Sequence, residues 1–518
     1  MRIVGRTPFS TALHAGRRSR ELARLGDEPR VDVVVIGGGI TGVGAALDAA
    51  SRGLRTVLVE RHDFAHGTSR WSSKLVHGGL RYLASGQIGI AHESATERHL
   101  LLTRIAPHLT RPLAQVLPLY APGHVSQGAF IGMGYGLGDG LRRFVGTPDA
   151  VLRSPGPIGV AETARLAPGV RRENLRGAMR GWDGQLIDDA RLVIGVARTA
   201  AGFGASVLSR VEAVHATGDR VRLRDGLTGE ELDLAARAVV NATGVWAGGL
   251  DPDVRLRPSR GTHLVIDSAR LGGSDVSLTV PVSGSRSRFV FTLPAQHGRT
   301  YIGITDVPAD GPIPDVPEAT EAEIDLLLGT VNAVLAEPLT RADVVATFAG
   351  LRPLLTSPHD VDETSDLSRR HAIRESSTGV LTVVGGKLTT YRRMAEDALD
   401  EAIRRRQLPA RASATRALPL VGAWPRDRLG EVAAPPRFVR RYGAEAPYAA
   451  ALPDGPSAAC GVTAQELQWG VAVEGALSID DLLDRRTRLG LVADDRRAST
   501  DAAAAAFERA GVDPPAVA

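Results

Sequence analysis

Two lysines are conspicuous among the residues able to do chemistry. Of the 62 basic residues, all are arginines except Lys74 and Lys387. Lys74 lies in a block of serine, histidine, glycine and arginine at 72–82, and Lys387 directly follows two glycines at 385–386. An ammonium is a compact charge whose pKa shifts readily on burial, whereas a guanidinium is a planar fork that stays charged. The pattern predicts two places that need a compact cation, and the alternative is chance within a compositional bias.

A glycine-rich turn near the start of the chain predicts a dinucleotide site. Residues 31–36 are a β-branched run typical of a buried parallel strand, and residues 43–52 are alanine-rich and helical. Between them stands the pattern G-x-G-x-x-G. We expect Gly37 to make the tight turn, Gly39 to let a pyrophosphate approach the backbone, and Gly42 to pack the helix on the strand.

The elements after this turn complete the expected site. The helix start offers the N–H groups of Ile40 and Thr41, with a partial positive charge, to phosphates. Glu60 ends a second strand at 56–60 and is expected to bind ribose hydroxyls. The fingerprint alone does not separate FAD from NAD. The late turn at 385–386 favours FAD, because it joins a strand to a helix in a way that suits close approach to an isoalloxazine ring.

At these residues the chain resembles the FAD-dependent glycerol-3-phosphate dehydrogenases of the D-amino-acid-oxidase-like flavoprotein superfamily. The resemblance covers most of 31–400 and continues at lower density to about residue 495, with the segment 474–489 resembling the family's C-terminal helical domain. Arg70-Trp71 departs from the small residues usual in the first block, and 128–140 is more glycine-rich than the family's aromatic-apolar stretch. The resemblance rests on blocks in family order at residues 68–83, 183–185, 241–244, 261–263, 303–306, 350–354, 368–371 and 385–392.

The resemblance implies an α/β fold. A Rossmann-like FAD-binding domain is expected to be interleaved with an antiparallel-sheet substrate domain and followed by a C-terminal helical domain. The expected boundaries are a basic tail at 1–30, the interleaved domains at 31–400 and the helical domain at 401–518. The substrate part is expected at 100–180 and 255–350, where 259–305 is rich in strand formers.

The resemblance also implies a reaction. Members of the family oxidise sn-glycerol 3-phosphate to dihydroxyacetone phosphate, transfer the hydride to FAD and pass the electrons to a membrane quinone. A related branch uses oxygen and carries an insertion before the last FAD block. Only 34 residues separate Arg352 from Lys387, which leaves no room for a large insertion. The open alternatives are a glycerol-3-phosphate oxidase, an amine or amino-acid oxidase, and a non-catalytic FAD- or NAD-binding protein.

Particular residues match the family's substrate site. Arg81, Arg352 and Arg369 are expected to bind the phosphate, since guanidinium forks suit phosphate oxygens. His263 is the candidate general base, with a purely site-shaping histidine as the alternative. Arg352 is a second candidate for holding the C2 oxygen. Tyr82 is expected to hydrogen-bond the substrate or to pack against it, and Lys387 to act in catalysis beside the reduced flavin ring.

The expected FAD contacts come from both ends of the chain. Besides the first turn and Glu60, the residues are Thr68, Ser69, Ser73, Lys74, His77, Gly78, Gly79, Leu80, Val211, Ala242, Gly244, Gly386, Lys387, Leu388 and Thr389.

Composition limits the other functions. Apolar residues make up 43% and charged residues 23% of the chain, which is ordinary for a globular protein. The single cysteine, Cys460, excludes an intrachain disulfide and fits a reducing compartment. Six of the thirteen histidines lie between 62 and 108, but no paired spacing with cysteine or carboxylate emerges, so no metal site is predicted.

The first 30 residues carry the net charge of +4, with seven arginines and three acidic residues. They are expected to be either a solvated start or an arm attracted to anionic lipid. A nucleic-acid partner is not expected, because the basic residues are not interleaved with aromatics. The resemblance implies a homodimer that is cytoplasmic and peripheral on the inner face of the cell membrane.

Overall fold

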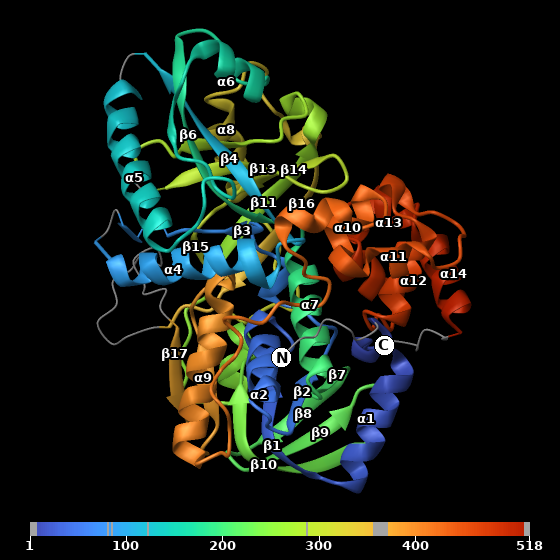
Figure 1. The fold of residues 1–518 in the computed structure, drawn as a ribbon. Helices are drawn as coiled ribbons and strands as arrows, with labels where there is room; N and C mark the ends of the chain where they lie inside the picture. The colour runs from blue at the N-terminus through green and yellow to red at the C-terminus, as the bar shows by residue number, and fades with distance from the viewer. Residues whose placement is uncertain are drawn as a thin grey trace.

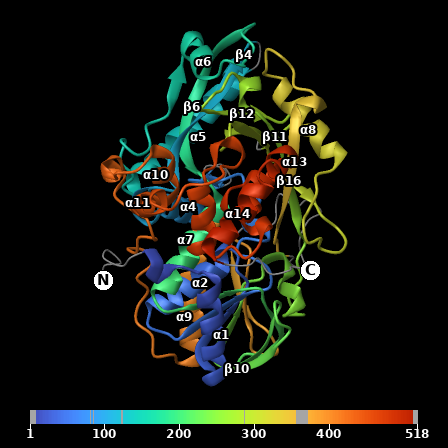
Figure 2. The same cartoon turned by 90° about the vertical axis from the view of Figure 1, so that its right-hand side faces the viewer.

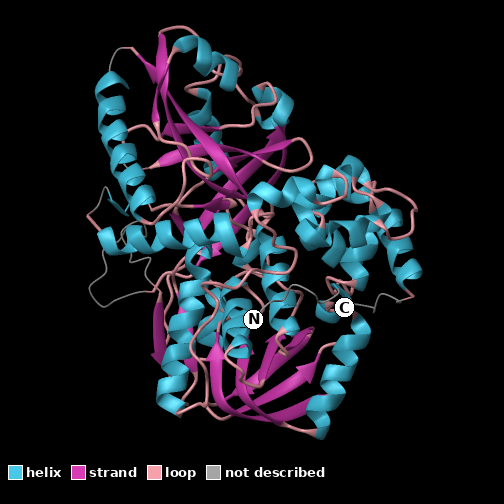
Figure 3. Cartoon of the chain, in the orientation of Figure 1, coloured by secondary structure: helices cyan, strands magenta, loops and turns pink. Residues whose placement is uncertain are grey.

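Two β-sheets and a set of C-terminal helices make up the chain (Figures 1 and 3). The computed structural model describes residues 8–511 except 80–81, 84–85, 122–123, 286–287 and 356–370. In Figure 1 the first sheet lies at the bottom, the second at the top, and the C-terminal helices beside both.

The first sheet has a parallel centre, in which β1 pairs with β2 and β10, β2 with β7, and β10 with β18. Val33, Val34 and Val35 of β1 are fully buried, as expected for a strand covered on both faces. The strand order is β17 (Ala372–Glu375), β18 (Leu381–Val384), β10 (Glu231–Asn241), β1 (Arg30–Ile36), β2 (Thr56–Glu60) and β7 (Ser206–Ser209), with β8 (Val211–Ala216) and β9 (Arg220–Asp225) continuing from β10.

Helices cover one face of this sheet. They are α2 (Ile40–Ser51), α7 (Asp189–Gly202) and α9 (Tyr391–Arg406), which share one apolar core with β1, β2 and β18. The opposite face packs against the β8–β9 hairpin and Leu25 of α1 (Ala15–Asp27). The strands that precede the two glycine turns, β1 and β18, therefore lie in one sheet, on either side of β10.

The second sheet is antiparallel except where β12 pairs with β4. It carries α5 (His124–Phe144), α6 (Val160–Leu166) and α8 (Glu321–Asn332) on its outside, and α4 (Ile88–Leu100) runs between the two sheets (Figure 1). Its order is β15 (Val307–Pro308), β11 (Ser259–Asp267), β14 (Arg299–Gly303), β13 (Phe289–Pro294), β12 (Ser277–Pro281), β4 (Thr110–Tyr120), β6 (Leu175–Leu186) and β3 (Leu75–Val76), with β16 (Val344–Arg352) beside β11 and β5 (Gly156–Ile158) beside β6. The predicted fold class is confirmed.

The C-terminal helices face the viewer in Figure 2. Thr463 caps α12 (Ala464–Ala472) in a reciprocal capping box with Glu466. Ion pairs of Arg485 and Arg486 with Asp63 join this region to the first sheet's loop after β2. The helices are α10 (Pro436–Tyr442), α11 (Ala446–Ala450), α12 (Ala464–Ala472), α13 (Ala493–Arg497) and α14 (Thr500–Ala510). None of the helices in the described ranges is long and apolar enough to cross a membrane.

The start of the chain differs from the expected solvated tail. Residues 8–27 are folded, because Arg18 of α1 is buried and its guanidinium donates to the Ser209 carbonyl at 2.8 Å and to Asp225 at 3.1 Å. The arginines of this segment are expected to be a solvated start or a lipid-binding arm, whereas Arg18 is an internal ion-pair partner of Asp225. Residues 1–7 lie outside the described residues.

Candidate active site

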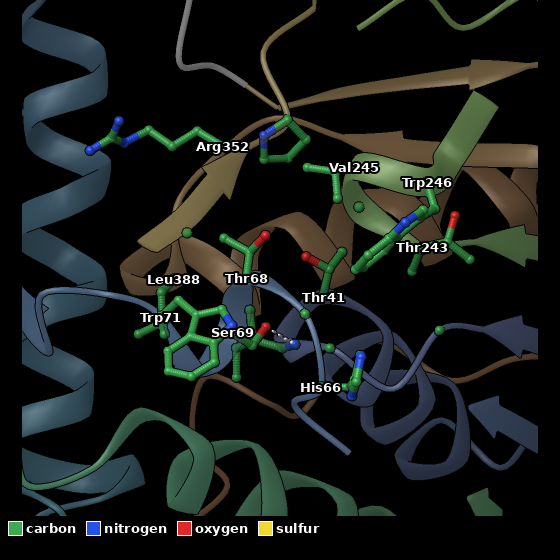
Figure 4. A pocket seen from close by; sticks show the side chains of 18 of the residues that line it. Thr41, His66, Thr68, Ser69, Trp71, Thr243, Val245, Trp246, Arg352 and Leu388 are labelled. Carbon is green, nitrogen blue, oxygen red and sulfur yellow. Dashed lines mark hydrogen bonds between the residues drawn. The ribbon is translucent and has the colours of Figure 1, made fainter. Parts of the chain in front are cut away.

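One cavity of about 1010 Å³ lies at the carboxyl ends of the parallel strands, between the two sheets. Ligand sites of open α/β sheets occur at this edge. Figure 4 shows its wall, with Thr41 and Ser69 on one side and Trp246 beside them. The predicted cofactor residues that line it are Gly37, Gly39, Ile40, Thr41, Glu60, Thr68, Ser69, Ser73, His77, Val211, Ala242, Gly244, Gly386, Lys387, Leu388 and Thr389.

The first glycine turn has the expected geometry. Gly37 has φ 110°, a conformation that favours glycine, and an added Cβ would lie 2.6 Å from the Ala242 carbonyl oxygen. At Gly42 an added Cβ would lie 1.8 Å from the Gly37 carbonyl oxygen. Gly42 does not line the cavity, so its role is helix–strand packing, as the fingerprint predicted.

Two side chains organise the backbone around this turn. The Glu60 carboxylate accepts hydrogen bonds from the Gly38 N–H at 2.6 Å and the His62 N–H at 2.7 Å, and burial raises its pKa. A carboxylate has further lone pairs with which to accept hydroxyl donors. Ser69 Oγ accepts from the Ile40 N–H at 2.9 Å, the dashed contact in Figure 4. Ser69 thus occupies the Ile40 N–H that the sequence predicted to face phosphates.

The late glycine turn brings the second lysine to the same cavity. Gly385 and Gly386 have φ 79° and 71° between β18 and the 3-10 turn that leads into α9. The Lys387 ammonium donates to Ser94 Oγ at 2.9 Å and lies 3.8 Å from the centre of the Tyr82 ring. Tyr82 itself is not among the lining residues.

The two lysine blocks meet directly. The His77 N–H donates to Thr389 Oγ1 at 3.2 Å, so residues 312 positions apart share one wall of the cavity. This contact places the Lys387 segment beside the first block.

Lys74 has a different place from the one expected. It does not line the cavity, since its ammonium is buried behind the wall and lies 3.2 Å from Asp189. It also donates to the carbonyls of Arg70 at 3.1 Å and Ser72 at 3.0 Å. Burial lowers its pKa to about 8, although Asp189 opposes this. Lys74 therefore braces the loop that carries Ser72 and Ser73, and the sequence could not separate bracing from contact.

Arg352 ends β16 and lines the cavity, as expected. Its guanidinium donates to Ser259 Oγ at 3.1 Å, to Asp306 at 3.3 Å and to the Thr305 carbonyl at 3.0 Å. These contacts fix the orientation of the fork, and Figure 4 shows the side chain extending away from Thr68 and Thr41.

His263 is buried and does not line the cavity. Its Nε2 lies 2.8 Å from Oγ of Ser73, which does line the cavity. Burial, followed by the charges of Lys74 and Arg352, lowers the pKa of His263 well below its usual value. The imidazole therefore does not reach the cavity directly, as a base in contact with substrate was expected to do, and among the described side chains it is linked to the wall through Ser73.

Several expected residues lie elsewhere. Gly78 and Gly79 are behind the wall, where the Gly78 N–H donates to Asp183 at 3.1 Å and an added Cβ at Gly78 would meet the Arg98 guanidinium at 2.1 Å. The remaining predicted site residues, Leu80, Arg81 and Arg369, lie outside the described residues.

Sequence reasoning missed two aromatic wall residues. Trp71 and Trp246 line the cavity, and an added Cβ at Gly67 would lie 2.7 Å from the Trp246 ring. Each follows a predicted motif closely in sequence. That proximity is the available signal, because Trp71 comes two residues after Ser69 and Trp246 two residues after Gly244, and both of these predicted site residues line the cavity.

A histidine cluster also forms at the cavity rim. Ring nitrogens of His62 and His66 and a carboxylate oxygen of Asp315 lie within 4.8 Å of one another, and the rings stack at 3.9 Å. The sequence predicted no metal because Asp315 is remote in the chain. Arg61 Nε donates to His62 Nε2 at 3.1 Å, and its guanidinium lies 3.8 Å from Asp315, so a cation already faces this group. Burial lowers the pKa of His66 to about 3.

Comparisons with known proteins agree with this geometry. The family model "DAO: FAD dependent oxidoreductase" matches residues 32–392. Glycerol-3-phosphate dehydrogenase 1 of Mycobacterium tuberculosis (strain ATCC 25618 / H37Rv) is 53% identical over 501 residues, which cover 94% of this chain and 97% of that protein. Glycerol-3-phosphate dehydrogenase 2 of Mycobacterium bovis is 39% identical over 518 residues, covering 93% and 85%.

A solved structure extends the likeness over nearly the whole fold. The glycerol-3-phosphate dehydrogenase of Bacillus halodurans, solved in complex with FAD, superposes with a TM-score of 0.72 at 27% identity and covers 97% of this chain and 95% of that one. The expected family is confirmed: the chain belongs to the DAO family of FAD-dependent oxidoreductases, and within it to the group of the glycerol-3-phosphate dehydrogenases.

Proposed function

We propose that this protein binds FAD and oxidises sn-glycerol 3-phosphate to dihydroxyacetone phosphate. The observation that carries the proposal is that Arg352 and Lys387 line the same cavity as the dinucleotide turn. The names of the relatives support the substrate, since they cover almost the full chain and are glycerol-3-phosphate dehydrogenases.

The residues present fit FAD. Gly37, Gly39, Ile40 and Thr41 line the cavity at the start of α2, and a helix start of this kind suits a pyrophosphate. Glu60 lies where a ribose is bound in this fingerprint. Gly386, with its positive φ, lets the backbone of the late turn approach a flat ring. When bound, the flavin supplies the acceptor for the hydride that leaves C2 of the substrate.

The protein's own cations bind and orient the substrate. The phosphate dianion is attracted by Arg352 and Lys387, and a charge-assisted hydrogen bond contributes about 1.5–3 kcal/mol. Thr305, Ser259 and Asp306 hold the Arg352 fork in one orientation. We assign Arg81 and Arg369 to the same phosphate on the strength of the family motif.

We propose a membrane quinone as electron acceptor and a homodimer on the inner face of the cell membrane. The short spacing of Arg352 and Lys387 supports the dehydrogenase over an oxygen-using oxidase.

The proposed contact with the membrane has its own support. Exposed Arg20 and Arg24 on α1, near the 55%-exposed Phe9, support contact with anionic lipid. Co-sedimentation with vesicles tests this contact: binding to anionic but not neutral vesicles is expected, and equal binding to both contradicts it.

The central test is an anaerobic titration of the purified holoenzyme with glycerol 3-phosphate, followed by flavin absorbance. Bleaching at millimolar substrate is expected, with slow reoxidation by air and fast reoxidation by a soluble quinone. No bleaching refutes the substrate. Rapid peroxide formation in air identifies an oxidase, and bleaching by an amine instead of the phosphate ester identifies an amine oxidase.

A further inference from the structure

The wall of the cavity and the buried His263 are joined by one hydroxyl group. Ser73 lines the cavity, and its Oγ lies 2.8 Å from His263 Nε2. Among the described residues, no other lining side chain has a hydrogen bond to His263. Any proton that moves between a ligand in the cavity and this imidazole therefore meets Ser73 first.

The imidazole is held where it is by the sheet. In β11, His263 pairs directly with Gly303 of β14 on one side and Phe348 of β16 on the other. Side chains of directly opposed residues share a face of the sheet. The ring stacks on Phe348 at 4.6 Å and 13°, and an added Cβ at Gly303 would lie 2.2 Å from its Cδ2. His263 thus has no room to swing into the cavity.

The ring is also in a state that can accept a proton. The side chain is fully buried, and Nδ1 has no hydrogen-bond partner in the described part of the chain. When the neutral ring carries its proton on Nδ1, the lone pair of Nε2 faces the Ser73 hydroxyl. Burial, followed by the charges of Lys74 and Arg352, holds the pKa of the ring well below its usual value.

We propose that Ser73 is a catalytic residue that passes the C2 hydroxyl proton of the substrate to His263. The substrate O–H bond breaks as an O–H bond forms at Ser73 Oγ, and the original Ser73 proton moves to His263 Nε2. The electron pair of the C2–H bond leaves as hydride to the flavin, and a C2=O double bond forms. The phosphate dianion supplies negative charge against the new imidazolium. The inference rests on the proposed function, to which it adds the path of the proton.

Stopped-flow reduction of the bound flavin by glycerol 3-phosphate tests the relay. Ser73→Ala removes the hydroxyl and is expected to slow reduction about 10²-fold or more, the range of a positioned proton transfer. It is also expected to abolish the solvent deuterium isotope effect. Ser73→Thr keeps a hydroxyl and is expected to recover most of the rate. Ser268→Ala is the matched control, because Ser268 follows β11 directly and its hydroxyl contacts Thr300 away from the cavity.

Two further measurements separate a relay from a structural role. Ser73→Ala is expected to retain FAD and to shift the ring-nitrogen chemical shifts of His263 in the resting protein, because the hydrogen bond to Nε2 is lost. The double variant Ser73→Ala/His263→Asn is expected to reduce flavin as fast as the slower of the two single variants, since both residues act in one path.

The outcomes are distinct. Wild-type rate in Ser73→Ala, independent losses that multiply in the double variant, or unchanged His263 shifts overturn the relay while leaving the proposed function intact. If Ser73→Ala fails to retain FAD, His263→Asn alone must show the lost rate and lost isotope effect, and wild-type behaviour there overturns the relay. A wild-type protein that glycerol 3-phosphate does not bleach refutes the proposed function, and the relay fails with it.

Discussion

Asp63 joins the cavity loop to the C-terminal helices through two buried arginines. Its carboxylate accepts from Arg485 Nε at 2.6 Å and from both terminal nitrogens of Arg486, at 2.7 and 2.9 Å. The side chains of Asp63 and Arg486 are each 1% exposed. Asp63 lies between Glu60 and His66, which both line the cavity. The substitution Asp63→Asn keeps the shape of the side chain and removes its charge.

The expected loss of unfolding free energy depends on the hydrogen bonds that Arg485 and Arg486 keep after the substitution. Arg485 retains Asp481 at 2.6 Å, whereas Arg486 retains its two hydrogen bonds to the carbonyl of Glu474. One guanidinium is thus left buried without a bonded carboxylate. Breaking a buried ion pair on one side costs about 3–5 kcal/mol, so the free energy of unfolding is expected to fall by that amount.

Urea unfolding, followed by tryptophan fluorescence, measures this change, and FAD retention after gel filtration reports whether the cavity loop has moved. Asp494→Asn is the control, because Asp494 pairs with Arg497 at the surface and is 85% exposed. That substitution is expected to have little effect. If Asp63→Asn lowers the free energy of unfolding by less than about 1 kcal/mol, the substitution does not leave an uncompensated buried charge, and the reasoning is refuted.

The same pair predicts a pH dependence. Burial alone raises the pKa of Asp63, but Arg486 and Arg485 outweigh it and hold the pKa well below its usual range. A carboxyl with a depressed folded-state pKa stabilises the protein above its unfolded pKa, and the stabilisation is lost as pH falls through the folded value. The difference in unfolding free energy between wild type and Asp63→Asn is therefore expected to be constant near neutral pH and to shrink in acid.

Three further predictions concern the turn and the lysines. Gly42→Ala places a Cβ 1.8 Å from the Gly37 carbonyl oxygen, so the purified variant is expected to lack flavin absorbance. Lys387→Arg is expected to slow flavin reduction in stopped flow, because a fork replaces the ammonium that contacts Ser94. Burial lowers the pKa of Lys74 to about 8 from 10.5, so the unfolded chain binds more protons between these pH values. Wild type is therefore expected to gain stability relative to Lys74→Met as pH rises from 8 to 10.5, measured by urea unfolding.

The local sequence pattern was sufficient to predict the dinucleotide part of the site. The strand 31–36, the glycine turn and Glu60 are adjacent in sequence, so the fingerprint specifies their geometry and the structure has it. The late turn at 385–386 was also predicted from its flanking strand and helix. The contact between the late turn and the block at 72–82, made by Thr389 and His77, could be expected only from the family resemblance. No local sequence signal encodes a contact between residues 312 positions apart.

Residues that differ from expectation do so through long-range packing. Lys74 turns away from the cavity because Asp189, at the start of α7, is fully buried and needs a cation. His263 lies behind the wall because its cross-strand partners Gly303 and Phe348 enclose it. Arg18 is buried because Asp225 comes from a distant hairpin. In each case the deciding partner is more than 30 residues away, beyond the reach of periodicity or spacing.

The two lysines share one physical setting although they have different places. The Lys74 ammonium lies 4.6 Å from the centre of the Phe348 ring and donates to two backbone carbonyls. The Lys387 ammonium lies 3.8 Å from the centre of the Tyr82 ring and donates to a serine hydroxyl. Each is a cation on an aromatic face with a small oxygen acceptor beside it. A planar guanidinium spreads five donors over a fixed fork, whereas each set of contacts described here is made by a single ammonium nitrogen. The compact ammonium is therefore the better fit in both places, in a chain that otherwise uses arginine.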